Sequence, residues 1–83
     1  MELTKEALFQ TFDKARETES SFVFVKVSAE GTEEVIVIPQ KSFDAKEQFY
    51  DKAYNDDLTH VMNSKVSVRG VSYGEATELN NIF

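Results

Sequence analysis

The sequence predicts a single small α+β domain in the order α-β-β-α-β, with a three-stranded, mainly antiparallel sheet packed by two helices. Two β-prone runs flank a short polar turn between residues 21 and 38, and segments with helical periodicity stand on both sides of that pair. A third run, residues 65–73, alternates apolar and polar residues as a strand does. With 83 residues, the chain has the length of one domain with one modest core.

The first predicted element is a helix over residues 3–18. Leu8, Phe12 and Ala15 recur at three- and four-residue spacing and make one apolar stripe. Thr4 offers a hydroxyl that can cap the N-terminus, where backbone N–H groups lack partners within the helix. The opposite side of the segment is charged, so we expect this helix to pack on the rest of the chain through one side only.

The next predicted element is the hairpin of residues 21–38. A three-residue loop over residues 29–31 places Gly31 where a left-handed conformation is needed, and it sets Lys26 opposite Glu34. The alternative is a two-residue loop over residues 30–31, which puts Glu30 at a positive φ and sets a valine opposite Glu34. The three-residue loop is favoured because every cross-strand pair is then chemically matched.

Both faces of the predicted hairpin are apolar. In the favoured register, one face carries Phe22, Phe24, Ile36 and Ile38, and the other carries Val23, Val25, Val27, Val35 and Val37. An antiparallel hairpin usually leaves one face polar. We therefore expect a cover on each face, either two helices or one helix and a second protein chain.

A second helix is predicted over residues 42–55, after Pro39 ends the hairpin. The residues at 55–57 are Asn-Asp-Asp, which form helices poorly and favour caps and turns. A break there is favoured over the alternative of one helix that continues to residue 62.

The third strand is predicted over residues 65–73, paired at an edge of the hairpin. Its alternation changes phase at Gly70, and a one-residue bulge there would bring Val66, Val68, Val71 and Tyr73 to one face. A polar C-terminal tail follows the strand.

The charge balance limits the classes of partner. Fifteen acidic and nine basic residues give a net charge of −6, so direct binding of nucleic acid through a basic face is not expected. No cysteine is present, which excludes disulfides and thiolate sites. The chain begins with an acidic amphipathic segment, and no run approaches the roughly 20 apolar residues that span a bilayer. We therefore expect a cytoplasmic protein that does not contact a membrane.

The one histidine, His60, follows Asp56 and Asp57 at helical spacing, which would suit a metal-dependent or hydrolytic enzyme. A catalytic zinc site usually takes more than one histidine, however, and the three glycines are too far apart for a phosphate-binding loop. The sequence favours a protein that is not an enzyme and holds no metal or cofactor.

Aromatic residues of the second helix and valines of the hairpin are the candidate interface residues. Aromatic side chains surrounded by charges are typical of protein interfaces, and an acidic rim would select a basic partner. The alternative for the aromatic residues is packing against the sheet. The candidate residues are Phe49, Tyr50, Tyr54, Asp51, Asp56, Asp57, Val23, Val25, Val35 and Val37.

The predicted function is non-enzymatic binding or regulation through protein–protein contact, with another protein or a second copy of the chain as partner. In size, acidity and lack of cysteine, the chain resembles accessory proteins of bacteriophages and prophages. An alternative is an inhibitor that imitates nucleic acid with its carboxylates and occupies the groove of a DNA-binding protein. That function needs clustered acids, and in the sequence they are spread over three segments.

Overall fold

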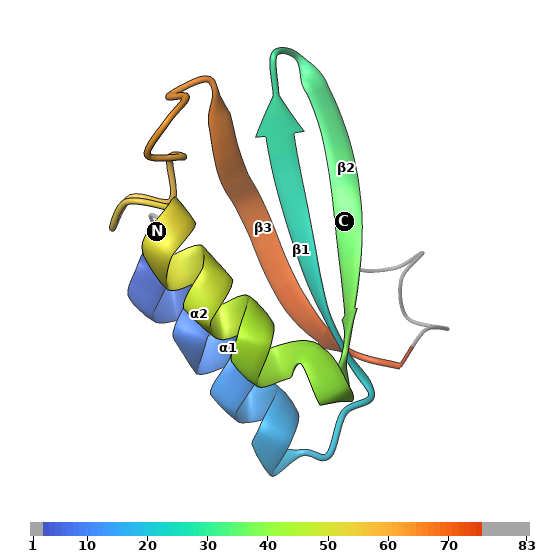
Figure 1. Ribbon diagram of the computed structural model, residues 1–83. Coiled ribbons are helices and arrows are strands. Elements are labelled where there is room, and N and C mark those ends of the chain that lie inside the picture. Colours follow the sequence, from blue (N-terminus) through green and yellow to red (C-terminus); the bar gives the residue numbers. More distant parts are fainter. Residues whose placement is uncertain (1–2, 76–83) are drawn as a thin grey trace.

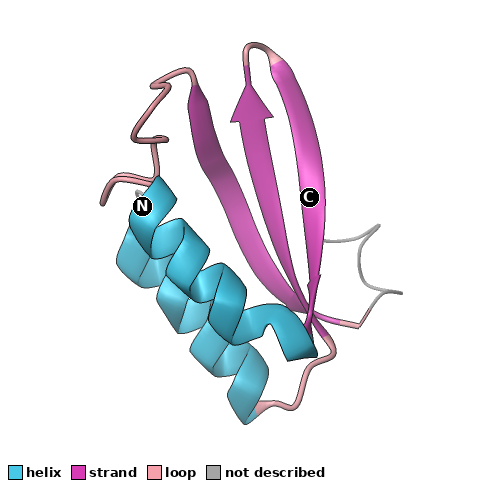
Figure 2. Cartoon of the chain, in the orientation of Figure 1, coloured by secondary structure: helices cyan, strands magenta, loops and turns pink. Residues whose placement is uncertain are grey.

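The computed structural model describes residues 3–75, which fold into two helices and one three-stranded antiparallel sheet (Figure 1, Figure 2). The elements are α1 (Lys5–Glu17), β1 (Phe22–Ala29), β2 (Thr32–Pro39), a short 3-10 helix (Gln40–Ser42), α2 (Phe43–Ala53) and β3 (Val66–Gly74). The strand order is β2-β1-β3. This confirms the predicted class and order of elements, while the predicted tail lies, from residue 76 on, outside the described residues.

Both helices lie side by side on one face of the sheet (Figure 1). The side of α1 that faces the sheet carries the predicted stripe, and Leu8, Phe12 and Ala15 are fully buried. Thr4 is the N-cap, and its hydroxyl accepts a hydrogen bond from the backbone N–H of Ala7 at 3.2 Å. Periodicity and capping in the sequence therefore place this helix correctly.

The hairpin has the two-residue loop, so the favoured three-residue loop and its register are wrong. Ala29 pairs with Thr32, and Lys26 lies opposite Val35 rather than Glu34. Glu30 and Gly31 have φ values of 51° and 87°, the pattern of a turn whose twist matches that of the flanking strands. The left-handed conformation of Glu30 costs about 1 kcal/mol, which the fit of the turn and the burial gained in this register offset.

This register also changes which residues share a face. Val23 pairs with Ile38 and Val25 with Ile36, so these four side chains face the helices together. Val23, Val25 and Ile38 are fully buried. The predicted division into a Phe-Ile face and a valine face is therefore wrong, because a shift of one residue moves the partner strand's side chains to the opposite face.

The face of the sheet away from the helices carries the remaining apolar residues of the hairpin. Phe24 lies opposite Val37, and the rings of Phe22 and Phe24 are 6.3 Å apart between centroids. Phe24 is fully buried, whereas Val35 and Val37 are 39% and 41% exposed. On the far face, the side chain of Phe24 is therefore buried, whereas the valine side chains of β2 are partly exposed to solvent.

β3 contains the predicted bulge. Val68 lies opposite Val27 and Gly70 opposite Lys26, which leaves Arg69 as the extra residue. The extra residue restores the phase of the alternation. As predicted, Val66, Val68, Val71 and Tyr73 all pack against the core on the helix side.

α2 ends where the sequence predicts a break. Tyr54, the residue after the last turn, is extended with φ −125° and ψ 148°, and it pairs with His60 in an isolated bridge. Leu58 is fully buried at a φ of 64°. The alternative of one helix to residue 62 is therefore wrong, because the chain reverses after Ala53 to bury Leu58.

Candidate interaction surfaces

The helical repeat divides the side chains of α2 among three directions. Phe43 and Tyr50, seven residues apart and thus on one side, face the core and are 2% and 1% exposed. Asp44, Glu47 and Asp51 follow at spacings of three and four and face α1. Phe49 and Ala53, four residues apart, lie on the third side. The three directions give α2 a core side, an acidic side and an apolar side.

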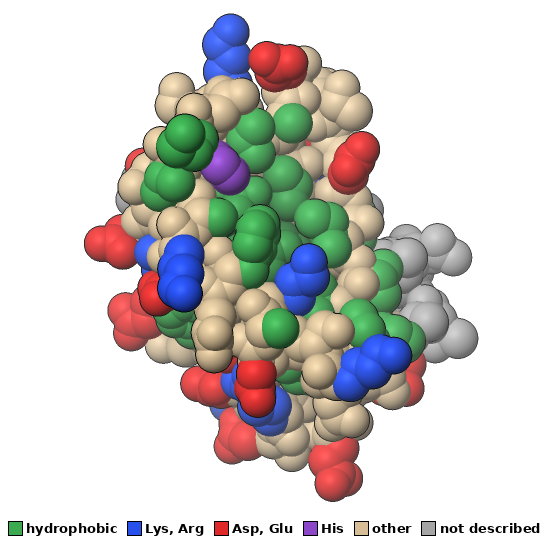
Figure 3. All heavy atoms as spheres, in the orientation of Figure 1, with side chains coloured by type: hydrophobic (Ala, Val, Ile, Leu, Met, Phe, Trp, Pro, Cys, Tyr) green, Lys and Arg blue, Asp and Glu red, His purple; other side chains and the backbone are tan. Residues whose placement is uncertain are grey.

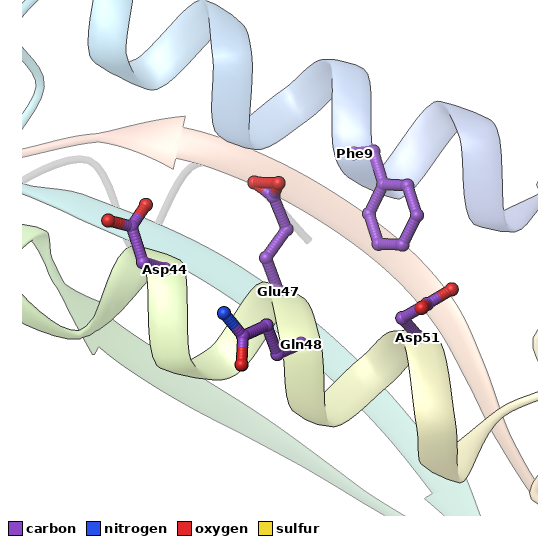
Figure 4. A pocket seen from close by; sticks show the side chains of 5 residues that line it. All are labelled: Phe9, Asp44, Glu47, Gln48 and Asp51. Atoms are coloured by element: carbon purple, nitrogen blue, oxygen red, sulfur yellow. The ribbon is translucent and has the colours of Figure 1, made fainter.

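The acidic side of α2 borders a shallow groove between the two helices (Figure 4). In Figure 4, Phe9 points from α1 toward α2, and Glu47 points from α2 toward α1. The residues that line the groove are Phe9, Asp44, Glu47, Gln48 and Asp51.

Basic residues of α1 neutralise the acidic side of α2 at both ends. The guanidinium of Arg16 donates to Asp44 and to Glu47, each at 2.7 Å, and these bonds raise the pKa of Arg16, with Glu47 as the main cause. Nζ of Lys5 donates to the backbone carbonyl of Asp51 at 2.8 Å and lies 3.6 Å from its carboxylate. These carboxylates of α2 are therefore already paired with cations of α1 within the chain.

The apolar side of α2 continues into the loop that follows the helix. The backbone N–H of Val61 donates to the carbonyl of Ala53 at 2.9 Å, so Val61 lies beside the last turn of α2, the turn that runs from Phe49 to Ala53. Phe49 is 48% exposed, Val61 49% and Met62 86%. We call Phe49, Ala53, Val61 and Met62 the α2 apolar surface. Figure 3 shows hydrophobic side chains gathered over α2 and the neighbouring strands, with the histidine among them.

A row of aromatic rings fixes the position of Phe49. Its ring contacts those of Tyr50 and Tyr54 at centroid distances of 5.2 and 6.4 Å, and Tyr54 in turn contacts His60 at 5.2 Å. The ammonium of Lys46 lies 5.3 Å from the centre of the Phe49 ring. Phe49 is therefore a half-exposed ring on a rigid base, with a positive charge beside it.

The loop that carries Val61 and Met62 is held by side-chain bonds. The Asp57 carboxylate accepts from the hydroxyl of Thr59 at 2.6 Å and from its N–H at 3.0 Å, and these bonds lower the pKa of Asp57. Nδ1 of His60 accepts from the N–H of Met62 at 3.0 Å. The chain thus presents Met62 from a fixed turn.

The structure does not bring His60 together with Asp56 and Asp57 in a catalytic arrangement. The imidazole is engaged with the backbone of Met62, the Asp57 carboxylate with Thr59, and the Asp56 carboxylate lies 4.0 Å from Nζ of Lys5. Within residues 3–75, no three or more His, Asp or Glu side chains are grouped so that they could hold a metal ion. None of the helices in this part of the chain has the length and apolar run needed to cross a membrane.

The candidate interface residues divide into buried and exposed groups. The buried ones, which cannot touch a partner of the folded chain, are Val23, Val25, Tyr50 and Tyr54; the exposed ones are Val35, Val37, Phe49, Asp51, Asp56 and Asp57. Val61 and Met62 were missed, although two apolar residues next to each other in a largely polar loop were a signal. The exposed apolar residues thus fall on two surfaces, one at α2 and one along β2.

In comparisons with known proteins, no family model, no curated protein and no solved structure matches this chain.

Proposed function

We propose that this protein is a non-enzymatic binding protein that docks to another protein through the α2 apolar surface. The observation that carries this proposal is the exposure of Phe49 on α2 and of Val61, whose backbone is bonded to the same helix, with the exposed Met62 next to Val61 in the chain. Single exposed apolar residues are common on protein surfaces, but adjoining ones in this number often mark interaction sites.

The residue types support a protein as partner. Aromatic residues and methionine are enriched at protein interfaces, and a ring held in place loses little conformational entropy when it is covered. Phe49 is such a ring, because Tyr50 and Tyr54 support it from below. Met62 is flexible and can fit the contour of a partner.

The charges around α2 support this surface over the acidic groove. Arg16 and Lys5 already pair with the carboxylates that face α1, so a basic partner or a DNA-binding protein would have to compete with intramolecular bonds. The charge beside Phe49 is instead the ammonium of Lys46. A partner with apolar residues and a carboxylate at the edge of its contact suits this arrangement.

The test compares two double variants in affinity capture from the cells that express the protein. Phe49→Ser with Met62→Ser removes the two largest side chains of the α2 apolar surface, and Val35→Ser with Val37→Ser is the matched control that removes exposed apolar area from β2. We expect the control to retain the partner of the wild type, and the first variant to bind the purified partner at least about tenfold more weakly, the effect of about 1.4 kcal/mol.

Thermal unfolding must show that both double variants fold. Equal affinity of the wild type and the Phe49/Met62 variant for the purified partner would refute the proposal. Loss of binding in the Val35/Val37 variant alone would move the binding site to β2.

A further inference from the structure

The two edges of the sheet differ in how their backbone groups are satisfied. The first half of β3 is bonded to the preceding loop: the N–H of Val68 donates to the carbonyl of Leu58 at 2.9 Å, and the N–H of His60 donates to the carbonyl of Val66 at 2.8 Å. The same strand carries the bulge at Arg69. Loops and bulges at an edge prevent pairing with other strands. β2 is the other edge strand.

Within residues 3–75, the outer edge of β2 has neither a loop bonded to it nor a bulge. All eight residues of β2 pair with β1 without a register shift, and no residue of 3–75 forms a backbone hydrogen bond to its outer side. The strand is regular from Thr32 to Ile38, and only Pro39, at its end, lacks an N–H.

The register identifies the backbone groups that point outward. Ala29 and Thr32 flank a two-residue turn and therefore form a hydrogen-bonded pair, after which bonded and non-bonded pairs alternate along the hairpin. The N–H and C=O groups of Glu33, Val35 and Val37 consequently point away from β1. Val35 and Val37 also expose about two fifths of their side chains on the far face, at 39% and 41%.

We propose that β2 pairs antiparallel with β2 of a second copy, about a two-fold axis at Ile36, to give a continuous six-stranded sheet. In this register Val35 lies opposite Val37 of the partner copy, and Ile36 lies opposite its equivalent. The outward N–H and C=O groups of the valines then bond across the axis, four hydrogen bonds by symmetry.

Matching apolar residues on the two strands support a second copy as the occupant, and charge allows this register. The chain has a net charge of −6, so two copies can associate only where their carboxylates are kept apart. With Ile36 on the axis, Glu34 lies opposite Ile38 and Glu33 opposite Pro39, so no carboxylate faces another. The pairs at the centre are all β-branched, which stabilises cross-strand contacts.

The first test is the oligomeric state of the full chain, measured by sedimentation from about 10 µM to about 1 mM. We expect a concentration-dependent dimer. Val37→Pro removes an outward N–H that the hairpin does not use, and should weaken the dimer at least about tenfold more than Val37→Ala, which keeps that N–H. A monomer over the whole range, or a dimer equally strong in the folded Val37→Pro variant, would overturn the proposal.

The second test uses the absence of cysteine from the chain. Ile36→Cys places one thiol at the axis, and mild oxidation should give a disulfide-linked dimer. Glu34→Cys, on the same face of the same strand and more exposed, should not cross-link, because residue 34 lies opposite residue 38. Faster cross-linking of Glu34→Cys would overturn the register. The Phe49/Met62 variant should still dimerise, so this inference and the proposed function can fail separately.

Discussion

The acidic side and the apolar side of α2 differ in how far their side chains are satisfied by contacts within the chain. Asp44 and Glu47 face α1 and are bonded to Arg16, while Phe49 faces away from α1 and is 48% exposed. The charged side is satisfied within the chain, and it holds the helices together. On the apolar side, the Phe49 ring packs on Tyr50 and Tyr54, but its outer part remains exposed. The difference teaches that an exposed charged row can be structural while a smaller apolar surface is the better candidate for binding.

The largest loss of stability is expected from a substitution of Tyr50, the residue next to Phe49. Tyr50→Ala removes a side chain that is 1% exposed and should lower the free energy of unfolding by about 3–5 kcal/mol, the range for an aromatic residue lost from a core. Phe49→Ala, the matched control, should cost less than about 1 kcal/mol. Urea denaturation followed by circular dichroism measures both, and equal losses would refute the division of α2 into core and apolar sides.

High pH should also lower the free energy of unfolding through Tyr50, by less than the loss expected for Tyr50→Ala. Burial raises the pKa of Tyr50 to about 12, with a further contribution from the charge of Tyr54. The folded-state pKa lies above the unfolded value of 10, so the neutral Tyr50 hydroxyl favours the folded chain. The stability that it contributes is complete below pH 10 and falls by about 2 kcal/mol as the pH rises toward 12.

The control for the pH effect is Tyr50→Phe, which has no group to titrate at this position. Denaturation between pH 9 and pH 12 should show a shallower loss of stability in Tyr50→Phe than in the wild type, by roughly the contribution of one tyrosine. Parallel curves would mean that the Tyr50 hydroxyl ionises as freely in the folded chain as in the unfolded one.

Local signals in the sequence predicted the elements, and they did so for reasons that the structure retains. The Leu8, Phe12 and Ala15 stripe is buried because a helix repeats every 3.6 residues, and Gly70 marks the bulge because the alternation changes phase there. Asn55 marks the end of α2 because its side chain favours turns. Each of these signals lies within a few residues of the feature that it predicts.

The hairpin register and the surfaces could not be predicted in this way, because they depend on contacts between distant segments. Matching of Lys26 with Glu34 favoured the wrong register, and burial of Val25 with Ile36 beneath the helices decided the right one. Tyr50 and Phe49 are similar in sequence context, and only the direction in which α2 packs separates them. The return of Val61 to Ala53 brings together residues that periodicity alone does not connect.

The charged side of α2 should tolerate change better than the core side. Arg16→Met keeps the contact with the rings of Phe12 and Phe43, whose centres lie 5.9 Å from the guanidinium, but loses the bonds to Asp44 and Glu47. We expect a loss of about 1 kcal/mol at low salt, which shrinks at high salt as the charges are screened.

The matched control for Arg16→Met lies one half-turn earlier on α1. Lys14→Met removes an exposed pair with Glu17 at 3.7 Å and should change stability by less than about 0.5 kcal/mol. Chemical denaturation in low and high salt measures both variants. A loss in Arg16→Met that does not depend on salt would show that packing, and not charge, joins the helices on this side.

The apolar side should give the smallest change in stability of the three. Met62→Ser removes a side chain that is 86% exposed, so the free energy of unfolding should stay within about 0.5 kcal/mol of the wild type. Retention on a hydrophobic-interaction column should nevertheless fall, because an accessible apolar group is lost, and Phe49→Ser with Met62→Ser should lower it further. An exposed surface that contributes little to folding but much to retention is free to bind. If Met62→Ser instead destabilised the chain as much as Arg16→Met does, Met62 would belong to the core, and the apolar side of α2 would be as fully satisfied within the chain as the charged side.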